Sequence, residues 1–272
     1  MKLKVFCAWW GLEHLGLEGM IEKIKINGFD GIECYIPNDS KDRTLLKKLL
    51  NEYKLDIIAH QFQANGDNFK EFAKSFRQSL INAAKFKPLK INSHTGKDFW
   101  SMEKNGMLIK IGEEIEKEYG VPVVHETHRG RFLYSGAVSK DYINSFKNLR
   151  INADFSHWVC VSESMMQDQE DTMSLAISRA DHIHARVGYE EGPQIPDPRV
   201  EQWRGHLDIF MGWWQRISDR HKEKDKEYLT ITPEFGPMPY TFQHPYTKKP
   251  IADFFEINCW LKEYLRENIT TD

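Results

Sequence analysis

Short apolar runs of strand type alternate with longer segments of helical periodicity along the whole chain. In the segment 69–86, apolar side chains recur at intervals of three and four residues, which is typical of an amphipathic helix. Strands are expected at about 3–8, 30–35, 56–61, 89–94, 121–126, 150–155, 181–186 and 229–235. Helices are expected over 18–26, 45–53, 69–86, 105–119, 138–147, 165–180, 201–221 and 252–266.

This alternation predicts an α/β fold, because strands that are each followed by a helix pair in parallel through right-handed crossovers. Eight units in 272 residues give about 34 residues each, as a (β/α)8 TIM barrel requires. An open doubly wound sheet usually carries a glycine-rich turn after its first strand, and residues 8–11 (Ala-Trp-Trp-Gly) do not form one. No linker or low-complexity stretch interrupts the chain, so a single barrel domain is expected over residues 1–272.

Two segments stand outside the repeating pattern. Residues 187–200 contain three prolines and are too long for a simple turn, so we expect an extended loop after the seventh strand, at the rim that carries active sites. Residues 222–227 (Lys-Glu-Lys-Asp-Lys-Glu) are expected to form a solvated helix end on the opposite face.

The composition excludes several classes of protein. Lys plus Arg number 37 and Asp plus Glu number 40, and the formal charge of −3 argues against a nucleic-acid-binding protein. The cysteines are too far apart for a disulfide scaffold or a zinc ribbon, which favours reduced thiols and a cytoplasmic location. No apolar run approaches the roughly 20 residues of a membrane span, so no association with membranes is expected.

Polar side chains recur where the predicted strands end, and a barrel brings these ends to one rim. They are Glu33, His60, His94, Glu126, Asp154, His184 and Glu234. Taken singly, such a residue is more often a hydrogen-bonded structural group than a ligand. Three carboxylates and one imidazole at the last four strand ends nevertheless predict a metal site formed by Glu126, Asp154, His184 and Glu234. This donor set suits one Mn²⁺, Mg²⁺ or Co²⁺ ion and also accepts Zn²⁺.

Side-chain alternation along the strands sharpens this prediction. If Glu126 faces the barrel axis, its neighbour His125 faces the helices and packs there. His182 has the same parity as His184 but lies one layer deeper, which predicts a core position.

Five local motifs resemble the xylose-isomerase-like barrel superfamily of sugar phosphate isomerases and epimerases over essentially the whole chain. They are Gly-Phe-Asp-Gly-Ile-Glu (28–33), Val-Pro-Val-Val-His-Glu (121–126), Asp-Phe-Ser-His (154–157), His-Ile-His (182–184) and Pro-Glu-Phe-Gly (233–236). In ketose 3-epimerases of this superfamily, Glu, Asp, His and Glu from the last four strands hold a divalent ion, and the two glutamates act as acid and base. The resemblance therefore implies catalytic roles for Glu126 and Glu234, and His157 resembles the family's substrate-oriented histidine.

The expected reaction is proton abstraction next to a carbonyl of a sugar or sugar phosphate, with the ion stabilising the enediolate charge. One of Glu126 and Glu234 would take the proton, and the other would return one to the same or an adjacent carbon. The same first step also suits a lyase or dehydratase. The further residues expected to bind substrate are Trp10, Glu33, His60, His94, His128, Arg186 and Arg199. For the loop residues His128 and Arg199, a solvated or salt-bridged role fits equally well, and for Trp10 packing is an alternative.

Two other functions fit the same barrel. Apurinic-site endonucleases of the superfamily hold three zinc ions with extra histidines, and His60 and His94 match these, although residues 197–199 (Asp-Pro-Arg) do not reproduce their late Asp-x-His pair. A barrel that binds a sugar without turnover is the third possibility. A homo-oligomer is compatible with the aromatic residues near 203–214, whose spacing also fits packing on the barrel wall.

Overall fold

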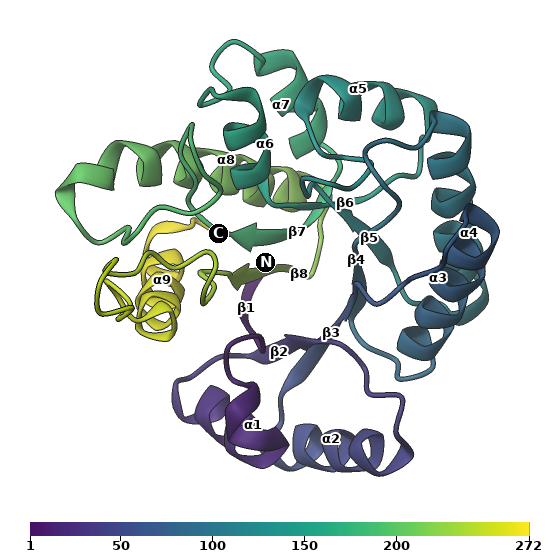
Figure 1. Ribbon diagram of the computed structural model, residues 1–272, viewed down its shortest axis with the longest axis horizontal. Coiled ribbons are helices and arrows are strands. Elements are labelled where there is room, and N and C mark those ends of the chain that lie inside the picture. Colours follow the sequence, from purple (N-terminus) through teal and green to yellow (C-terminus); the bar gives the residue numbers. More distant parts are fainter. Residues whose placement is uncertain (272) are drawn as a thin grey trace.

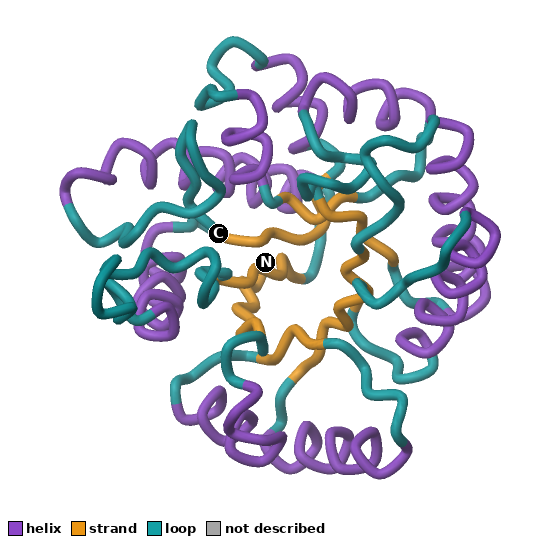
Figure 2. The backbone as a smooth tube through the Cα atoms, in the orientation of Figure 1, coloured by secondary structure: helices purple, strands orange, loops and turns teal. Residues whose placement is uncertain are grey.

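The computed structural model describes residues 1–271 and has a closed barrel of eight parallel strands at its centre (Figures 1 and 2). Each strand pairs with the next along the chain, and the last strand pairs with the first. Helices surround the barrel, as Figure 2 shows. The predicted α/β class and (β/α)8 TIM barrel are therefore confirmed.

The elements follow one another as the alternating pattern predicts, with one addition after the sixth strand. The strands are β1 (Lys2–Ala8), β2 (Gly31–Cys34), β3 (Asp56–Gln61), β4 (Lys90–Ser93), β5 (Val123–Glu126), β6 (Ile151–Ala153), β7 (Ala180–Ala185) and β8 (Tyr228–Pro233). The α-helices are α1 (Gly16–Ile26), α2 (Ser40–Tyr53), α3 (Phe69–Ala84), α4 (Met102–Tyr119), α5 (Gly136–Ser145), α6 (Phe155–Ser162), α7 (Glu170–Ile177), α8 (Arg204–Glu223) and α9 (Phe254–Asn268). Short 3-10 helices precede α1 (η1, Glu13–Leu15) and α8 (η2, Glu201–Trp203).

The added helix, α6, corrects two expected boundaries. The sixth strand ends at Ala153 instead of continuing to 155, because the Asp154 side chain accepts a hydrogen bond from the backbone of Ser156 and caps α6. The helix expected over 165–180 is α7 alone, which covers only Glu170–Ile177. The sequence pattern does not reveal α6 because the start of this helix is buried, so it has no polar face to give a helical period.

The helices form for the reasons that their sequences suggest. In α3, Phe72, Phe76 and Leu80 are buried on one face, and the Asn68 side chain caps the first turn by accepting from the backbone of Glu71 at 3.1 Å. Gly120 ends α4 with φ 70°, a conformation that glycine adopts readily. This packing fixes the strands, and with them the rim at which the strands end.

The structure tests two expectations about surface residues, one for the aromatic side chains near 203–214 and one for the charged run at 222–227. Trp213 and Trp214 of α8 are buried, so these aromatic side chains pack inside the protein rather than forming an exposed patch. The end of α8 and the residues up to 227 are largely exposed, as the charged run predicts.

All four cysteines are free thiols. Within residues 1–271, none of the helices combines the length and the apolar character that crossing a membrane requires.

Candidate metal centre

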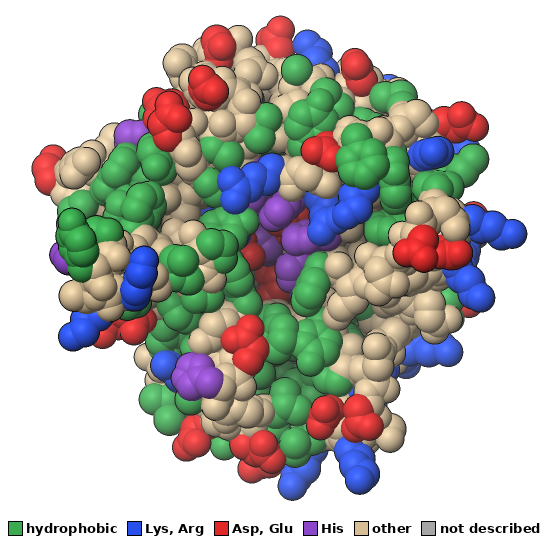
Figure 3. Space-filling model, in the orientation of Figure 1, with side chains coloured by type: hydrophobic (Ala, Val, Ile, Leu, Met, Phe, Trp, Pro, Cys, Tyr) green, Lys and Arg blue, Asp and Glu red, His purple; other side chains and the backbone are tan. Residues whose placement is uncertain are grey.

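A hollow of about 370 Å³ opens at the carboxyl ends of the strands. In Figure 3 histidine and acidic side chains lie inside this central hollow, and basic side chains lie at its edge. The lining residues are Ala8, Trp9, Trp10, Glu13, Glu33, His60, Phe62, His94, Glu126, His128, Arg186, Glu234 and Tyr240. A larger cleft of about 910 Å³ lies between the turns at the other end of the barrel, and it contains none of the predicted site residues.

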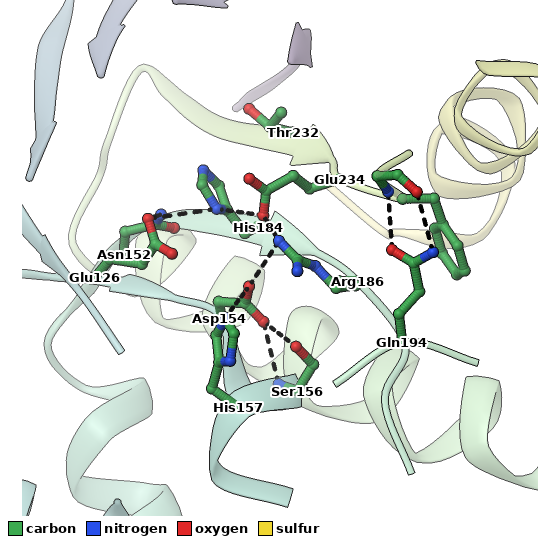
Figure 4. A network of polar contacts seen from close by, with 12 residues as sticks. Glu126, Asn152, Asp154, Ser156, His157, His184, Arg186, Gln194, Thr232 and Glu234 are labelled. Atoms are coloured by element: carbon green, nitrogen blue, oxygen red, sulfur yellow. Dashed lines mark hydrogen bonds and ion pairs between the residues drawn. The ribbon is translucent and has the colours of Figure 1, made fainter. Parts of the chain in front are cut away.

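Three of the four predicted metal ligands meet at this rim. Glu126, Asp154 and His184 each offer a donor atom, and these atoms all lie within 4.8 Å of one another. The fourth, Glu234, follows β8 directly, and its Oε2 lies 2.7 Å from Nδ1 of His184 (Figure 4). All four side chains are buried. The barrel therefore brings together residues that are 108 positions apart in the sequence.

The donor atoms of this group are compatible with a metal ion. Among residues 1–271, Asp154 Oδ2 and His184 Nδ1 have no well-formed hydrogen-bond partner although both are buried. The other oxygen of Asp154 accepts from Ser156, so Oδ2 is held in place beside Arg186. Three buried carboxylates beside one imidazole offer the hard oxygen donors and the nitrogen donor that Mn²⁺ and related ions accept. The residues present therefore fit a divalent ion.

Arg186 supplies a positive charge to the same group. Its Nη2 contacts Glu234 and lies 3.4 Å from Asp154 Oδ2. Figure 4 shows Arg186 between these two carboxylates. The guanidinium carbon lies 4.6 Å from the centre of the Tyr240 ring and 5.9 Å from that of Trp10. Burial alone would lower the pKa of Arg186, but Glu234 and Asp154 outweigh burial and raise it, so the side chain stays charged.

The carboxyl groups differ strongly in their affinity for protons. Burial would raise the pKa of Glu234, but Arg186 and His184 bring it down to about 2. Burial likewise opposes ionisation of Glu126, and the neighbouring His94 and His184 hold its pKa well below the usual range. Burial raises the pKa of Asp154 to about 7, since Arg186 only partly offsets it. Glu126 and Glu234 are therefore carboxylates at neutral pH, as proton acceptors must be.

Glu33 lies below the donor group and fixes one of its members. Its carboxylate accepts from His184 Nε2 at 2.9 Å, from His182 Nε2 at 3.1 Å and from Thr232 Oγ1 at 2.6 Å. A histidine that gives one ring N–H to a carboxylate turns its other nitrogen outward, which is the usual support of a metal-binding imidazole. Here the outward nitrogen is Nδ1 of His184, which faces Glu234. Glu33 thus orients His184, a predicted metal ligand, as well as lining the hollow.

Three further histidines, His60, His94 and His128, line one wall of the site, and a fourth, His157, packs behind them. His94 Nε2 lies 3.2 Å from Glu126 Oε2, and His60 Nε2 lies 3.9 Å from the same oxygen. The rings of His128 and His157 lie 4.0 Å apart, centre to centre. Burial lowers the pKa of His60 to about 4 and that of His128 to about 3, so these two rings are neutral at physiological pH. Neutral imidazoles can bind sugar hydroxyls or a second metal ion.

The structure assembles most of the predicted site residues and leaves one outside. His157 lies behind the hollow on α6, with Nε2 3.5 Å from Asp154 Oδ2. Arg199 does not line the hollow; its Nε and Nη2 bind Asp197 at 2.8 and 2.7 Å within the long loop. As alternation predicts, His125 packs against Gly112 of α4, and its Nδ1 lies 2.7 Å from Thr95 Oγ1.

Tyr240 and Gln194 are site residues that the sequence pattern does not reveal. Tyr240 belongs to the connection between β8 and α9, residues 234–253, and borders the hollow. Gln194 belongs to the connection after β7, and its amide holds both backbone groups of Gly236, at 2.8 and 3.3 Å. The only sequence signal was the proline and aromatic content of these two segments.

Comparisons with known proteins agree with this architecture. The profile of the xylose isomerase-like TIM barrel family matches residues 21–222. Similar solved structures include D-allulose 3-epimerase from Methylomonas sp. in complex with D-allulose (TM-score 0.67, 15% identity, 98% of this chain and 97% of that one). A second is the E. coli 3-keto-D-glucoside 4-epimerase YcjR (TM-score 0.62, 14% identity, 98% of this chain and 100% of that one). A third is endonuclease IV from Thermus thermophilus (TM-score 0.59, 11% identity, 98% of this chain and 98% of that one).

At these identities the solved structures show a shared fold, and no curated protein matches the sequence. The family profile, in contrast, covers most of the chain, from within the first helix to the end of α8. The strand ends within that match carry three of the buried donors described above. This chain is a member of the xylose isomerase-like TIM barrel family.

Proposed function

We propose that the protein is a divalent-metal-dependent isomerase or epimerase of a sugar or sugar phosphate. The observation that carries this proposal is the meeting of Glu126, Asp154, His184 and Glu234 at the rim of the barrel. The epimerases among the similar structures support it, since they share the fold over nearly the whole chain. In this proposal the enzyme is cytoplasmic and acts on a small molecule.

In this proposal the four ligands hold one Mn²⁺, Mg²⁺ or Co²⁺ ion, and Zn²⁺ is also accepted. When bound, such an ion polarises a substrate carbonyl and stabilises the negative charge that forms beside it. Glu126 and Glu234 are ionised at neutral pH. One of them removes the proton on the carbon next to the carbonyl, and the other returns a proton to the same or an adjacent carbon.

The surrounding side chains bind and orient the sugar. Arg186 keeps Nε and Nη1 without a partner among the described residues, and these N–H groups donate to substrate oxygens. His60, His94 and His128 bind hydroxyl groups along one wall. His157 supports this wall from behind through its contact with His128. Trp9, Trp10 and Tyr240 provide an apolar side that limits the access of water.

Proton exchange with solvent tests the proposal directly. The Mn²⁺-loaded protein is incubated in D₂O with a panel of ketoses, aldoses and their phosphates, and deuterium at carbon is followed by NMR. We expect exchange in at least one substrate and a loss of about 10²–10⁴-fold in Glu234→Gln and Glu126→Gln. Glu18→Gln, on the exposed face of α1, is the control. Unchanged exchange in both pocket variants would remove the acid and base assignment.

A second candidate function is a multinuclear zinc phosphoesterase. It is favoured by one observation: donor atoms of His60, His94 and Glu126 lie within 4.8 Å of one another beside the first group. Endonuclease IV also shares this fold. Metal content separates the two functions, because about one ion per chain fits the isomerase, whereas two or three Zn²⁺ and cleavage of abasic DNA fit the phosphoesterase. Sugar binding without exchange would indicate a non-catalytic barrel.

A further inference from the structure

A second hollow of about 410 Å³ opens beside the first on the same rim of the barrel. Tyr240 lines both hollows, so this single side chain separates them. The other walls of the second hollow come from the connection between β8 and α9 and from the loops after β5 and β7. The main side chains are Arg129, Pro193, Met238, Pro239 and Phe242.

Hydrogen bonds hold these walls in one arrangement. Gln194 binds both backbone groups of Gly236, and Thr241 Oγ1 donates to the same Gly236 carbonyl. Further along, the backbone N–H of Ile251 donates to the carbonyl of Phe242 at 2.9 Å, which closes the connection on itself. The second hollow is therefore formed before any ligand arrives, as is usual for binding sites of small molecules.

The chemistry of the second hollow differs from that of the first. Met238 is 52% exposed and Phe242 38% exposed, and two prolines continue this apolar surface. Among its described lining residues there is one cation, Arg129, and no carboxylate or histidine. The guanidinium carbon of Arg129 lies 5.5 Å from the centre of the Tyr240 ring, at the boundary between the hollows. Such a surface suits a flat group with an apolar face and a polar edge, and it offers no donors for a metal ion.

We propose that the second hollow binds the glycosidic substituent of the substrate, so that the substrate is a glycoside whose ring carries the reacting keto group rather than a free monosaccharide. This inference rests on the proposed function, because the reacting sugar ring then lies in the first hollow beside Glu126 and Glu234. Because only the Tyr240 side chain stands between the two hollows, the substituent passes over it to lie against Phe242 and Met238. A single sugar ring fills only the first hollow and leaves this preformed apolar surface without a ligand.

Binding measurements on the Mn²⁺-loaded protein test the inference. Saturation-transfer NMR and calorimetry compare D-glucose, D-galactose and D-mannose with the phenyl β-glycoside of each sugar and with cellobiose and lactose. We expect at least one glycoside to bind about fivefold or more tightly than its parent sugar, the factor expected from one aromatic contact. Phe242→Ala and Met238→Ser should each remove most of that preference. Tyr246→Ala is the matched control, since Tyr246 is 89% exposed in the same connection and does not line the hollow.

Each outcome has a distinct meaning. Equal affinity for sugars and glycosides overturns this inference and leaves the proposed function standing. A preference that survives in both Phe242→Ala and Met238→Ser, with the variants folded, also overturns it, because the substituent then binds elsewhere. If neither the sugars nor the glycosides bind and none of the ketoses, aldoses and phosphates of the exchange panel reacts, the proposed function itself fails. Phenyl glycosides favoured over disaccharides identify an aromatic substituent, and the reverse identifies a second sugar.

Discussion

The guanidinium group of Arg186 contacts the carboxylate of Glu234, one of the four proposed metal ligands. The same Nη2 lies 3.4 Å from Asp154 Oδ2, so one fixed cation touches two of these ligands. The same oxygen of Glu234 that contacts Arg186, Oε2, also lies 2.7 Å from His184 Nδ1. In the proposed function a divalent ion and Arg186 would share the charge of the same carboxylates, and the strength of metal binding would depend on this arginine.

Removing this cation should strengthen metal binding while weakening catalysis. In Arg186→Met the carboxylates of Glu234 and Asp154 lose their counter-ion, so a divalent ion gains more from binding them. We expect the affinity for Mn²⁺ to rise about tenfold, and turnover to fall because substrate oxygens lose a donor. Calorimetric titration with Mn²⁺ measures the first effect, with Arg199→Met as the control. A lower affinity for Mn²⁺ would show instead that Arg186 positions Glu234 for the ion.

The metal ion should also stabilise the fold. An ion that binds only the folded state raises the free energy of unfolding by about 2.7 kcal/mol at a concentration of 100 times its dissociation constant. We therefore expect EDTA to lower the melting temperature and Mn²⁺ to restore it, and activity should follow the same course. In Asp154→Asn this response to Mn²⁺ should largely disappear. A melting temperature that is insensitive to both EDTA and Mn²⁺ in the native protein would contradict the metal centre.

Glu33 should affect metal binding without touching the ion. In Glu33→Gln the buried rings of His184 and His182 lose their carboxylate partner. Loss of such a partner typically weakens metal affinity by about 10–100-fold, and breaking a buried charged pair costs about 3 kcal/mol of stability. Calorimetry with Mn²⁺ and urea unfolding measure the two effects.

The matched control for this prediction is Glu18→Gln, which removes a carboxylate from the exposed face of α1. It should change neither quantity. If Glu33→Gln keeps full Mn²⁺ affinity but loses affinity for substrate, Glu33 acts as a substrate ligand and not as a support for His184.

The sequence was sufficient to predict the barrel and to place the proposed metal ligands at its rim, because both depend on regular features. Each proposed ligand is the last residue of a strand or directly follows one, or lies one residue before the strand's end, and a parallel barrel must bring these ends to one rim. The alternation of side chains along a strand also predicts correctly that His125 faces the helices.

The remaining features depend on side-chain conformation or on irregular backbone. Nothing in the spacing of His184 and Arg186 shows that the guanidinium turns back onto Glu234. Arg199 lies in a loop whose path no periodic pattern specifies, and its neighbour Asp197 binds it there. Tyr240 lies in a connection of the same kind, so its place between the two hollows emerged only from the structure.

Lys90 is a buried lysine at the start of β4, at the end of the barrel opposite the candidate metal centre. Its Nζ donates to the backbone carbonyl of Asp181 in β7. Burial lowers the pKa of Lys90 to about 8, because the carboxylate of Asp181 only partly offsets the loss of water. In the unfolded chain the pKa of a lysine is about 10.4. The unfolded state therefore binds more protons between about pH 8 and pH 10.4.

This difference predicts how stability varies in alkaline solution. Below pH 8 both states are protonated and the fold bears the full cost of the buried charge, on the order of 3 kcal/mol at about 1.4 kcal/mol per pKa unit. As the pH rises from 8 to about 10.4, the folded protein loses this proton first, so the contribution of Lys90 to stability increases. In Lys90→Met this rise should be absent. The stability of the variant relative to the native protein should therefore fall by up to about 3 kcal/mol over this interval.

Urea unfolding at pH 7.0, 8.5 and 10.0 measures the prediction. Comparing the variant with the native protein cancels the other groups that titrate in this range, and Asp181 contributes little because its pKa is lowered from an already acidic value. Lys226→Met is the matched control, since it removes a lysine that is exposed in the same region. A constant difference between Lys90→Met and the native protein would mean that Lys90 keeps an ordinary pKa, and hence that water reaches its ammonium group.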